Sequence, residues 1–283
     1  CFSTEPEAGL NGRSIGYARG KVIGGSSSIN AMIYMRGQKS DYDYWASQGN
    51  RGWGWDDVLP IFRRSEDYQH GADDFHGSGG ELRVEERRVN WEILDVWREA
   101  AAQCGIPKIK EFNTGDNFGN AYFQMNQRSG KRWSAARAFL DTAQKRPNLT
   151  VMTQAMVQKL AIEQTDNGAT VSGVHVLHKG HSQLINARNE VLLAAGAVAS
   201  PQILQLSGIG EPELLQSHSV ELKCNLPGVG NNLQDHLQIR TIYSVDNTVT
   251  LNRRAKYPWG MAKMGLEYFF NKTGPMTMPP SQL

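Results

Sequence analysis

The sequence predicts an α/β fold with α+β insertions, and three neighbouring stretches carry that prediction. The run 191–195 is strand-sized and very apolar, which is typical of a strand inside a sheet that helices cover. It leads through Gly196 into a helix that we expect to begin with Ser200 as N-cap and Pro201 in its first turn. Before it, residues 148–190 alternate β-rich runs with turn residues, which predicts a small antiparallel meander.

Turn and cap residues place the remaining elements. Two hairpin turns are expected in the meander, at 166–168 and at 179–180. Three helices and one short strand are expected in the first half of the chain, and Pro60 is expected near the first turn of the helix 54–68. These elements are the helix 40–49, the helix 54–68, the strand 81–84 and the helix 90–105.

A glycine- and serine-rich stretch near the N-terminus is unusually free of bulky side chains. Gly24 and Gly25 precede three serines, and the apolar run 26–35 predicts a buried helix that begins at these serines. Bare glycines let a phosphate approach the backbone, and serine hydroxyls and helix N-terminal N–H groups add donors. The stretch is neither a Walker A loop nor a G-x-G-x-x-G turn. A flexible loop is the alternative interpretation, and the residues alone leave both open.

The small residues 194–197 have two interpretations as well. A strand that ends in small residues lets a flat or phosphorylated ligand lie close to the edge of a sheet. The alternative is tight packing between the helix and the sheet, without a ligand.

Composition excludes several classes of protein. The 283 residues carry a net charge of +2 with scattered Lys and Arg, which argues against a nucleic-acid partner. No apolar run approaches the roughly 20 residues of a membrane span. Three distant cysteines fit a reducing compartment and no disulfide framework or zinc site. The chain begins at Cys1 and ends in a Pro-rich stretch, so we expect an internal segment of a longer protein.

The histidines do not form a convincing metal site in the sequence. The triplet His175, His178 and His181 falls on a strand and past a turn, so the three imidazoles are expected to face solvent and not one ion. His70 and His76 lie in a Gly-rich segment without a carboxylate or cysteine at ligand spacing. No metal site is therefore expected.

Two other groups favour structural roles. Asp235 and His236 are adjacent, and adjacent side chains rarely present an acid and a base to one point, so a structural role is favoured over an acid/base pair. Trp45, Trp53 and Trp55 are expected to form core under the second helix. There is no G-x-S-x-G elbow, which argues against a hydrolase.

Two long motifs in register resemble the glucose–methanol–choline (GMC) flavin oxidoreductases. The first consists of a basic residue, an aliphatic pair, Gly-Gly, small residues and an aliphatic–Asn pair, and reads KVIGGSSSIN over 21–30. The second reads GAVASPQILQLSGIG over 196–210. Between and after them, NRGWGWDDVLPIFRRSED, RPNLTVMTQAMVQKL and LPGVGNNLQDH stand in family order. The resemblance covers essentially the whole chain.

The resemblance implies part of a Rossmann-like FAD-binding domain with a small meander and the start of a substrate-binding domain. On that basis 1–235 is the FAD-binding segment without its N-terminal βαβ unit, with part of the substrate domain interleaved around 60–130. Residues 236–283 then begin a truncated substrate-binding domain. The chain alone is expected to bind FAD weakly or not at all.

The resemblance also assigns cofactor residues. The stretch that matches 20–33 wraps the pyrophosphate and ribityl chain of FAD in the family, and a strand residue holds the adenine. Some members attach FAD covalently through a His just before the Asn; this position is Ile29 here, which implies non-covalent FAD. The expected cofactor-binding residues are Gly20, Lys21, Val22, Gly24, Gly25, Ser26, Ser27, Asn30, Ala31, Met32, Val157, Ala194 and Gly196.

Activity is implied for a parent enzyme rather than for this segment. The family's catalytic His and its His or Asn partner match no residue up to Leu283, so no catalytic residue is expected here. The branch that the motifs resemble oxidises choline or aliphatic primary alcohols to aldehydes. Its members commonly pass electrons to a quinone or another carrier at a membrane surface. The resemblance therefore implies a cytoplasmic enzyme that can associate peripherally with the bacterial inner membrane. A non-redox family member such as a hydroxynitrile lyase, an inactive truncated polypeptide and an unrelated nucleotide-binding module are the alternatives.

Overall fold

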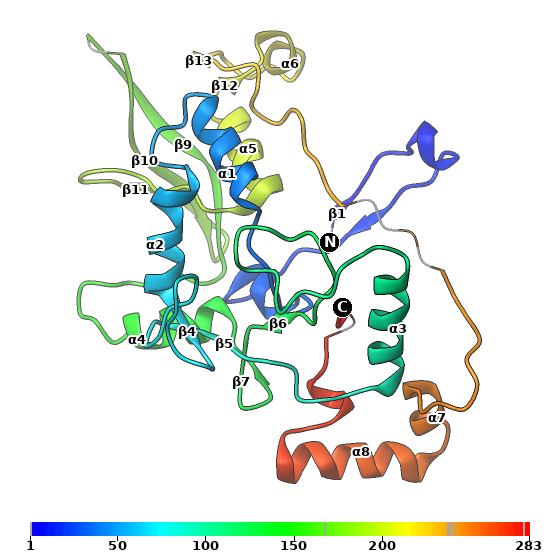
Figure 1. The fold of residues 1–283 in the computed structure, drawn as a ribbon. Helices are drawn as coiled ribbons and strands as arrows, with labels where there is room; N and C mark the ends of the chain where they lie inside the picture. The colour runs from blue at the N-terminus through cyan, green and yellow to red at the C-terminus, as the bar shows by residue number, and fades with distance from the viewer. Residues whose placement is uncertain (1, 167, 237–238, 240, 280) are drawn as a thin grey trace. The chain divides into compact units, whose positions relative to one another are not determined.

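The computed structural model describes residues 2–166, 168–236, 239, 241–279 and 281–283. The chain forms two compact units (Figure 1). Unit 1 comprises Cys1–Leu149 and Ser244–Leu283, and unit 2 comprises Thr150–Tyr243. Each unit is described by itself below.

Unit 1 combines helices with short two-stranded pairings. Its antiparallel pairs join β1 to β2, β3 to β6 and β7 to β8, whereas β4 and β5 run parallel. Its helical segments are η1 (Ala8–Leu10), η2 (Gly25–Ser28), α1 (Lys39–Ser47), α2 (Trp55–Ser65), α3 (Glu92–Gln103), η3 (Ala136–Leu140), α4 (Asp141–Ala143), α7 (Leu251–Ala255), α8 (Pro258–Asn271) and η4 (Pro275–Thr277). Its strands are β1 (Phe2–Ser3), β2 (Gly16–Tyr17), β3 (Ile33–Tyr34), β4 (Glu66–Tyr68), β5 (Leu82–Val84), β6 (Gln124–Met125), β7 (Gln127–Arg128) and β8 (Lys131–Arg132).

The expected helices of unit 1 are present, with shifts at their ends. Helix α1 begins one residue early, because Gln38 and Asp41 form a capping box in place of a Ser40 cap. Pro60 lies in the middle of α2 and not in its first turn. Helix α3 and the strand β5 lie where the sequence predicts them.

The core of unit 1 lies around β5 and β6, where Val84 and Met125 are fully buried. The expectation of a tryptophan core is correct for Trp55 and wrong for Trp45 and Trp53, which are about half exposed (47% and 53%). Trp45 and Trp53 pack edge-to-face on each other at a centroid distance of 5.8 Å. Trp45 lies on α1, which has no buried residue, and Trp53 lies in the turn before α2.

The expectation of a helix over 26–35 is wrong. Only the short 3₁₀ turn η2 forms there, and β3 follows it. Serine hydroxyls bond to nearby backbone carbonyls and Met32 takes a left-handed backbone conformation (φ 64°), so local bonds replace the helical ladder.

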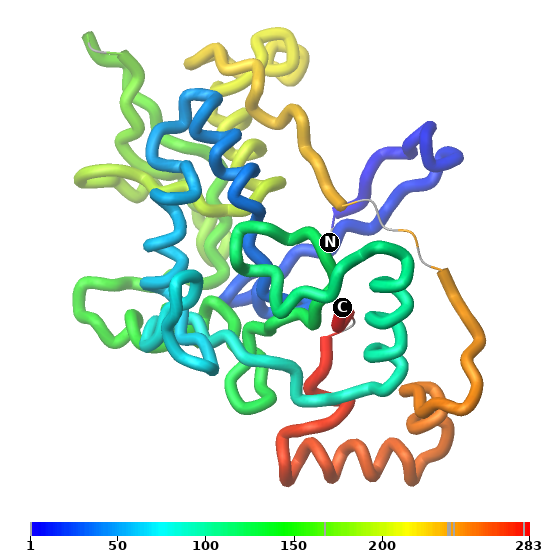
Figure 2. Tube along the Cα trace, in the orientation of Figure 1, coloured from blue at the N-terminus to red at the C-terminus, as the bar shows by residue number. Residues whose placement is uncertain are grey.

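Unit 2 contains the expected meander. The strands β9 (Ala155–Thr165), β10 (Gly168–His178) and β11 (His181–Asn186) pair antiparallel in the order β11-β10-β9. Figure 2 shows the described parts of this segment as long neighbouring stretches of the trace. Asn167, in the first expected turn, lies outside the described residues. Its remaining elements are α5 (Gly196–Leu206), β12 (Ile209–Gly210), α6 (Pro212–Ser217) and β13 (Cys224–Asn225), with β12 and β13 parallel.

The run 191–195 does not form the expected buried strand. It pairs with no described segment, and Leu192 is 81% exposed. A strand needs a neighbour that pairs with its backbone groups, and none of the sheets of the described residues includes this run. The helix after it begins at Gly196, so the expected N-cap Ser200 and first-turn residue Pro201 both lie inside the helix. Ser200 Oγ accepts the N–H of Ala195, the residue before the helix, at 3.1 Å.

Among the described residues, no helix is long and apolar enough to cross a membrane.

Candidate functional site: a glycine–serine loop in unit 1

The loop 20–32 folds back tightly on itself before β3 begins. Gly24 and Gly25 both have left-handed backbones, with φ of 90° and 55°. A Cβ atom on Gly20 would lie 2.2 Å from the carbonyl oxygen of Gly25. The close approach of these two backbone segments requires glycine at position 20.

The serine hydroxyls stabilise the loop internally. Ser27 Oγ donates to the carbonyl of Gly24, and Ser28 Oγ donates to the carbonyl of Ile23 at 2.9 Å. Ser26 Oγ accepts the N–H of Gly20 at 3.3 Å. The expectation that these hydroxyls add donors for a ligand is therefore wrong for Ser27 and Ser28, which are committed to the backbone of the loop.

Met32 closes the loop in a conformation that is uncommon for a residue with a side chain. Its N–H donates to Asn30 Oδ1 at 3.0 Å, and its carbonyl accepts the N–H of Asn126 at 2.7 Å. Both backbone groups of the strained residue are thus held by partners. Local strain of this kind persists where the surroundings over-determine it, and it clusters at ligand sites.

The loop leaves donors and apolar side chains open. Among the described residues, the backbone N–H groups of Gly24 and Ala31 have no acceptor. Val22, Ile23 and Ile29 are each at least half exposed. Bare backbone donors suit a phosphate and apolar neighbours suit a flat ring, so the residues of this loop fit FAD.

The expected cofactor residues of unit 2 lie on separate elements. Val157 is on β9 opposite Val176, Ala194 is in the unpaired run, and Gly196 begins α5 with φ 87°. A Cβ on Gly196 would meet no atom within 4 Å, so open space lies beside it. The structure brings Gly20, Lys21, Val22, Gly24, Gly25, Ser26, Ser27, Asn30, Ala31 and Met32 together in the loop of unit 1.

A buried polar cluster lies just beyond β3, and no sequence pattern predicts it. His76 is completely buried, with Nδ1 3.0 Å from Glu66 Oε2 and Nε2 2.6 Å from Glu111 Oε2. Arg36 Nη2 reaches Glu66 Oε2 at 2.9 Å, and the Tyr68 ring stacks on the imidazole at 3.9 Å. The interpretation that His76 lacks a carboxylate partner is wrong, because both partners reach it through the fold.

The geometry makes His76 an imidazolium. Each ring nitrogen faces a carboxylate, so both must donate a proton. Burial by itself lowers the pKa of His76, but hydrogen bonds and charge from Glu111 and Glu66 raise it to about 9. The pKa of Glu111 is lowered: burial raises it, but the His76 hydrogen bond and charge outweigh burial.

The same cluster does not form a convincing metal site. Asp73, His76 and Glu111 bring their ligand atoms within 4.8 Å of one another. However, the 2.6 Å hydrogen bond between His76 and Glu111 leaves no room for an ion with two bonds of about 2.0–2.2 Å. Both nitrogens of His76 are already engaged, so the cluster is an internal ion network.

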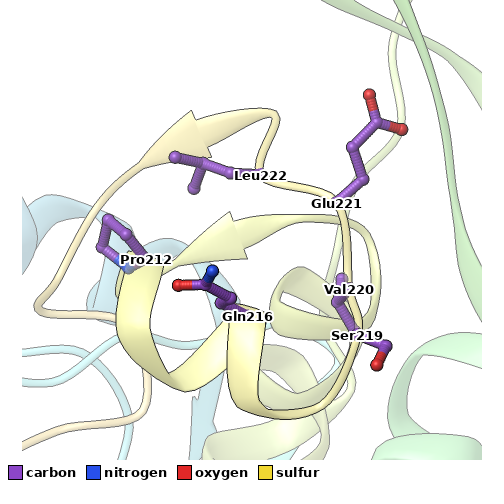
Figure 3. Close-up of a pocket in the computed structure, with 6 residues that line it drawn as sticks. All are labelled: Pro212, Gln216, Ser219, Val220, Glu221 and Leu222. Carbon is purple, nitrogen blue, oxygen red and sulfur yellow. The ribbon is translucent and has the colours of Figure 1, made fainter.

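A surface hollow of unit 2 contains none of the expected cofactor residues. It has a volume of about 420 Å³ and is drawn in Figure 3. Glu221 is its one charged residue, and Gln216 extends from α6. Pro212, Gln216, Ser219, Val220, Glu221 and Leu222 line it, and none of them is an expected cofactor residue.

The other histidines have ordinary settings. His178 and His181 face each other across the second hairpin turn, and His175 lies opposite Lys159 on β9. The N–H of His236 donates to Asp235 Oδ1 at 2.8 Å, which is a local backbone contact.

Comparison with known proteins decides the family. The family model described as GMC oxidoreductase matches residues 6–238. The chain belongs to the GMC oxidoreductase family. The loop 20–32 and the helix α5 both fall within the matched part of this GMC chain.

Curated relatives extend the match over nearly the whole GMC chain. Human mitochondrial choline dehydrogenase is 39% identical over 274 residues, which is 97% of this chain and 45% of the relative. The oxygen-dependent choline dehydrogenase of Brucella anthropi is 38% identical over 273 residues, which is 96% of this chain and 49% of the relative. The chain thus spans about half the length of these relatives.

Solved structures share the fold. An FAD-dependent oxidoreductase from Chaetomium thermophilum matches with a TM-score of 0.89 at 28% identity, over 100% of this chain and 51% of its own. Pyridoxine 4-oxidase from Mesorbium loti matches with a TM-score of 0.76 at 38% identity, over 83% of this chain and 46% of its own.

Proposed function

We propose that this chain forms part of the FAD site of an enzyme that oxidises a primary alcohol, choline or an aliphatic alcohol, to the aldehyde. The observation that carries the proposal is the loop 20–32, with its close glycine contact, its open backbone donors and its exposed aliphatic residues. The similarity to choline dehydrogenases over nearly the whole chain supports the choice of substrate class.

The chain's own residues bind and orient. FAD, when bound, supplies the hydride acceptor for alcohol oxidation. Gly24 and Gly25 let a phosphate approach the backbone, and the free N–H groups of Gly24 and Ala31 supply donors to it. Val22 and Ile29 offer apolar surface to the rest of the cofactor and exclude water from it. Val157, Ala194 and Gly196 are the proposed contacts from unit 2.

The proposal includes non-covalent attachment. Ile29 precedes Asn30, and its aliphatic side chain has no nucleophile to bond to the flavin. A similar structure, of a formate oxidase from Aspergillus oryzae at 25% identity, was solved to study the effect of a mutation on FAD modification, so the mode of attachment needs its own test. Acid precipitation of the full-length gene product should leave its flavin colour in the supernatant. Flavin that stays in the washed pellet would contradict this part of the proposal.

Domain roles and location are further parts of the proposal. Residues 1–235 are assigned to the FAD-binding domain, with substrate-domain segments interleaved around 60–130, and 236–283 to the substrate-binding domain. A quinone or another carrier is the proposed electron acceptor. The proposed location is the cytoplasm, with peripheral association at the bacterial inner membrane.

Anaerobic reduction tests the activity. Adding choline or a primary aliphatic alcohol to the full-length gene product without oxygen should bleach its flavin absorbance. Flavin that stays oxidised while a hydroxynitrile substrate is cleaved would instead assign the protein to a non-redox branch.

A further inference from the structure

Arg132 lies at the end of β8, far from the loop in the sequence but in direct contact with it. Its Nη1 donates to Asn30 Oδ1 at 2.8 Å and to the carbonyl oxygen of Ser27 at 3.1 Å. More than one hundred residues separate the partners in the chain. The Arg132 guanidinium thus bonds to Ser27, in the middle of the loop, and to Asn30, near its end.

The hairpin that carries Arg132 is itself held in place. Strands β7 and β8 pair around Ser129 and Gly130. The N–H of Ser129 donates to the Glu85 carboxylate at 3.1 Å, and the N–H of Trp133 donates to the carbonyl of Asn126 at 2.9 Å. Arg132 therefore extends from a fixed backbone, and its rigid guanidinium fixes whatever it bonds.

The contact determines the orientation of the Asn30 amide. Both groups at Asn30 Oδ1, the Arg132 guanidinium and the Met32 N–H, are donors, so the oxygen must face them. The Nδ2 hydrogens then point elsewhere, and they have no acceptor among the described residues. The same bond supports the left-handed backbone of Met32, whose N–H shares the Asn30 oxygen.

A second contact joins the same two segments. The N–H of Ala135 donates to Ser27 Oγ at 2.9 Å. Segment 132–135 thus contacts the loop at Ser27 through both its backbone and a side chain. Arg132 is the only charged member of this contact among the described residues, and its own side chain is half-buried.

We propose that Arg132 is a positioning residue for FAD, which acts through Asn30 and the Ser27 carbonyl by holding the loop in its ligand-receiving conformation. This inference rests on the proposed function, because it concerns how the chain receives that cofactor. Arg132 need not touch FAD itself; its effect passes through the amide of Asn30.

The test measures FAD dissociation constants of the full-length gene product, from which FAD has been removed, by fluorescence titration. Arg132→Met should weaken FAD binding about 10-fold or more, the size expected for lost hydrogen bonds to a charged group. Lys131→Met removes the same charge one residue away, and within the described residues the Lys131 side chain has no hydrogen bond or ion pair with the loop. This variant should change FAD binding by no more than about 2-fold. Arg132→Lys should recover little, since one ammonium cannot replace the guanidinium geometry.

A double-mutant cycle with Asn30 separates positioning from a general structural role. If Arg132 acts through Asn30, the effect of Arg132→Met on FAD binding should shrink in an Asn30→Ala background. Additive effects, full recovery by Arg132→Lys or wild-type affinity in Arg132→Met would each overturn the inference. If the Arg132→Met variant does not fold, as shown by the absence of a cooperative thermal unfolding transition, the same FAD-binding measurements are made with Arg132→Gln. Failure of the wild type to bind FAD would instead overturn the proposed function, and this inference with it.

Discussion

At the scale of single residues, the buried imidazolium of His76 links the fold of unit 1 to pH. Its pKa is raised to about 9, so its charge contributes stability that is fully present below the ordinary value of 6.5. This contribution fades as the pH rises through about 9. Glu111, whose pKa is lowered, contributes stability above its ordinary value, and this is lost as the pH falls through the lowered value.

The test is to measure how the thermal unfolding midpoint of the full-length gene product changes as the pH rises from 6.5 to above 9. The wild type should lose stability across this range, whereas His76→Gln should be flatter and less stable at neutral pH. The replacement removes the cation between Glu66 and Glu111, and losing one partner of a buried ion pair costs about 3–5 kcal/mol.

His70→Gln is the matched control for this substitution. His70 lies in the same segment, but its side chain is 59% exposed and 4.0 Å from Glu86. It should behave like the wild type at every pH. A His76→Gln variant with wild-type stability and wild-type pH dependence would refute the buried imidazolium.

The motif that carries the family resemblance is readable from the sequence, whereas the partners of the ion network are not. The motif KVIGGSSSIN is contiguous, so its spacing alone indicates the resemblance. Glu111 is 35 residues from His76, and Arg132 is 102 residues from Asn30. Such pairings arise from the tertiary fold, and no local spacing encodes them.

At the scale of elements, the loop 20–32 depends on the contact between two backbone segments. Gly20→Ala would place a methyl group 2.2 Å from the Gly25 carbonyl oxygen, so the loop must open. We expect weaker FAD binding, since forced backbone strain costs of the order of 1–3 kcal/mol. Fluorescence titration of the full-length gene product with FAD measures the effect.

Gly9→Ala is the control for this loop prediction. A Cβ at Gly9 meets no atom within 4 Å, and Gly9 has no left-handed backbone. Its FAD affinity should match that of the wild type. Equal affinities for both glycine variants would mean that the closed loop is not what FAD binds.

Elements with regular periodicity or clear turn residues were predictable. Helix α3 and the strands β9 to β11 follow such patterns. The segment 26–35 was predicted to be a helix, but hydroxyl–backbone bonds and the left-handed Met32 overrode its apolar pattern. The run 191–195 has the pattern of a central strand without a described partner, and pattern alone cannot supply one.

At the scale of the whole molecule, membership of the GMC family was predictable because two long motifs stand in register across the chain.

If the folded protein binds FAD, the cofactor should stabilise it by mass action. At an FAD concentration of about 100 times the dissociation constant, the gain is about 2.7 kcal/mol. Thermal unfolding of the full-length gene product with increasing FAD should show a rising midpoint, while riboflavin, which lacks the phosphates, should raise it less. Equal shifts with both would argue against phosphate binding by the loop.

The most direct test of the account is the visible spectrum of the full-length gene product during anaerobic addition of alcohol. We expect an oxidised flavin spectrum after purification or reconstitution with FAD, and bleaching of that spectrum by choline or a primary aliphatic alcohol. A protein that takes up no FAD, or whose bound flavin stays oxidised with every primary alcohol, would contradict it.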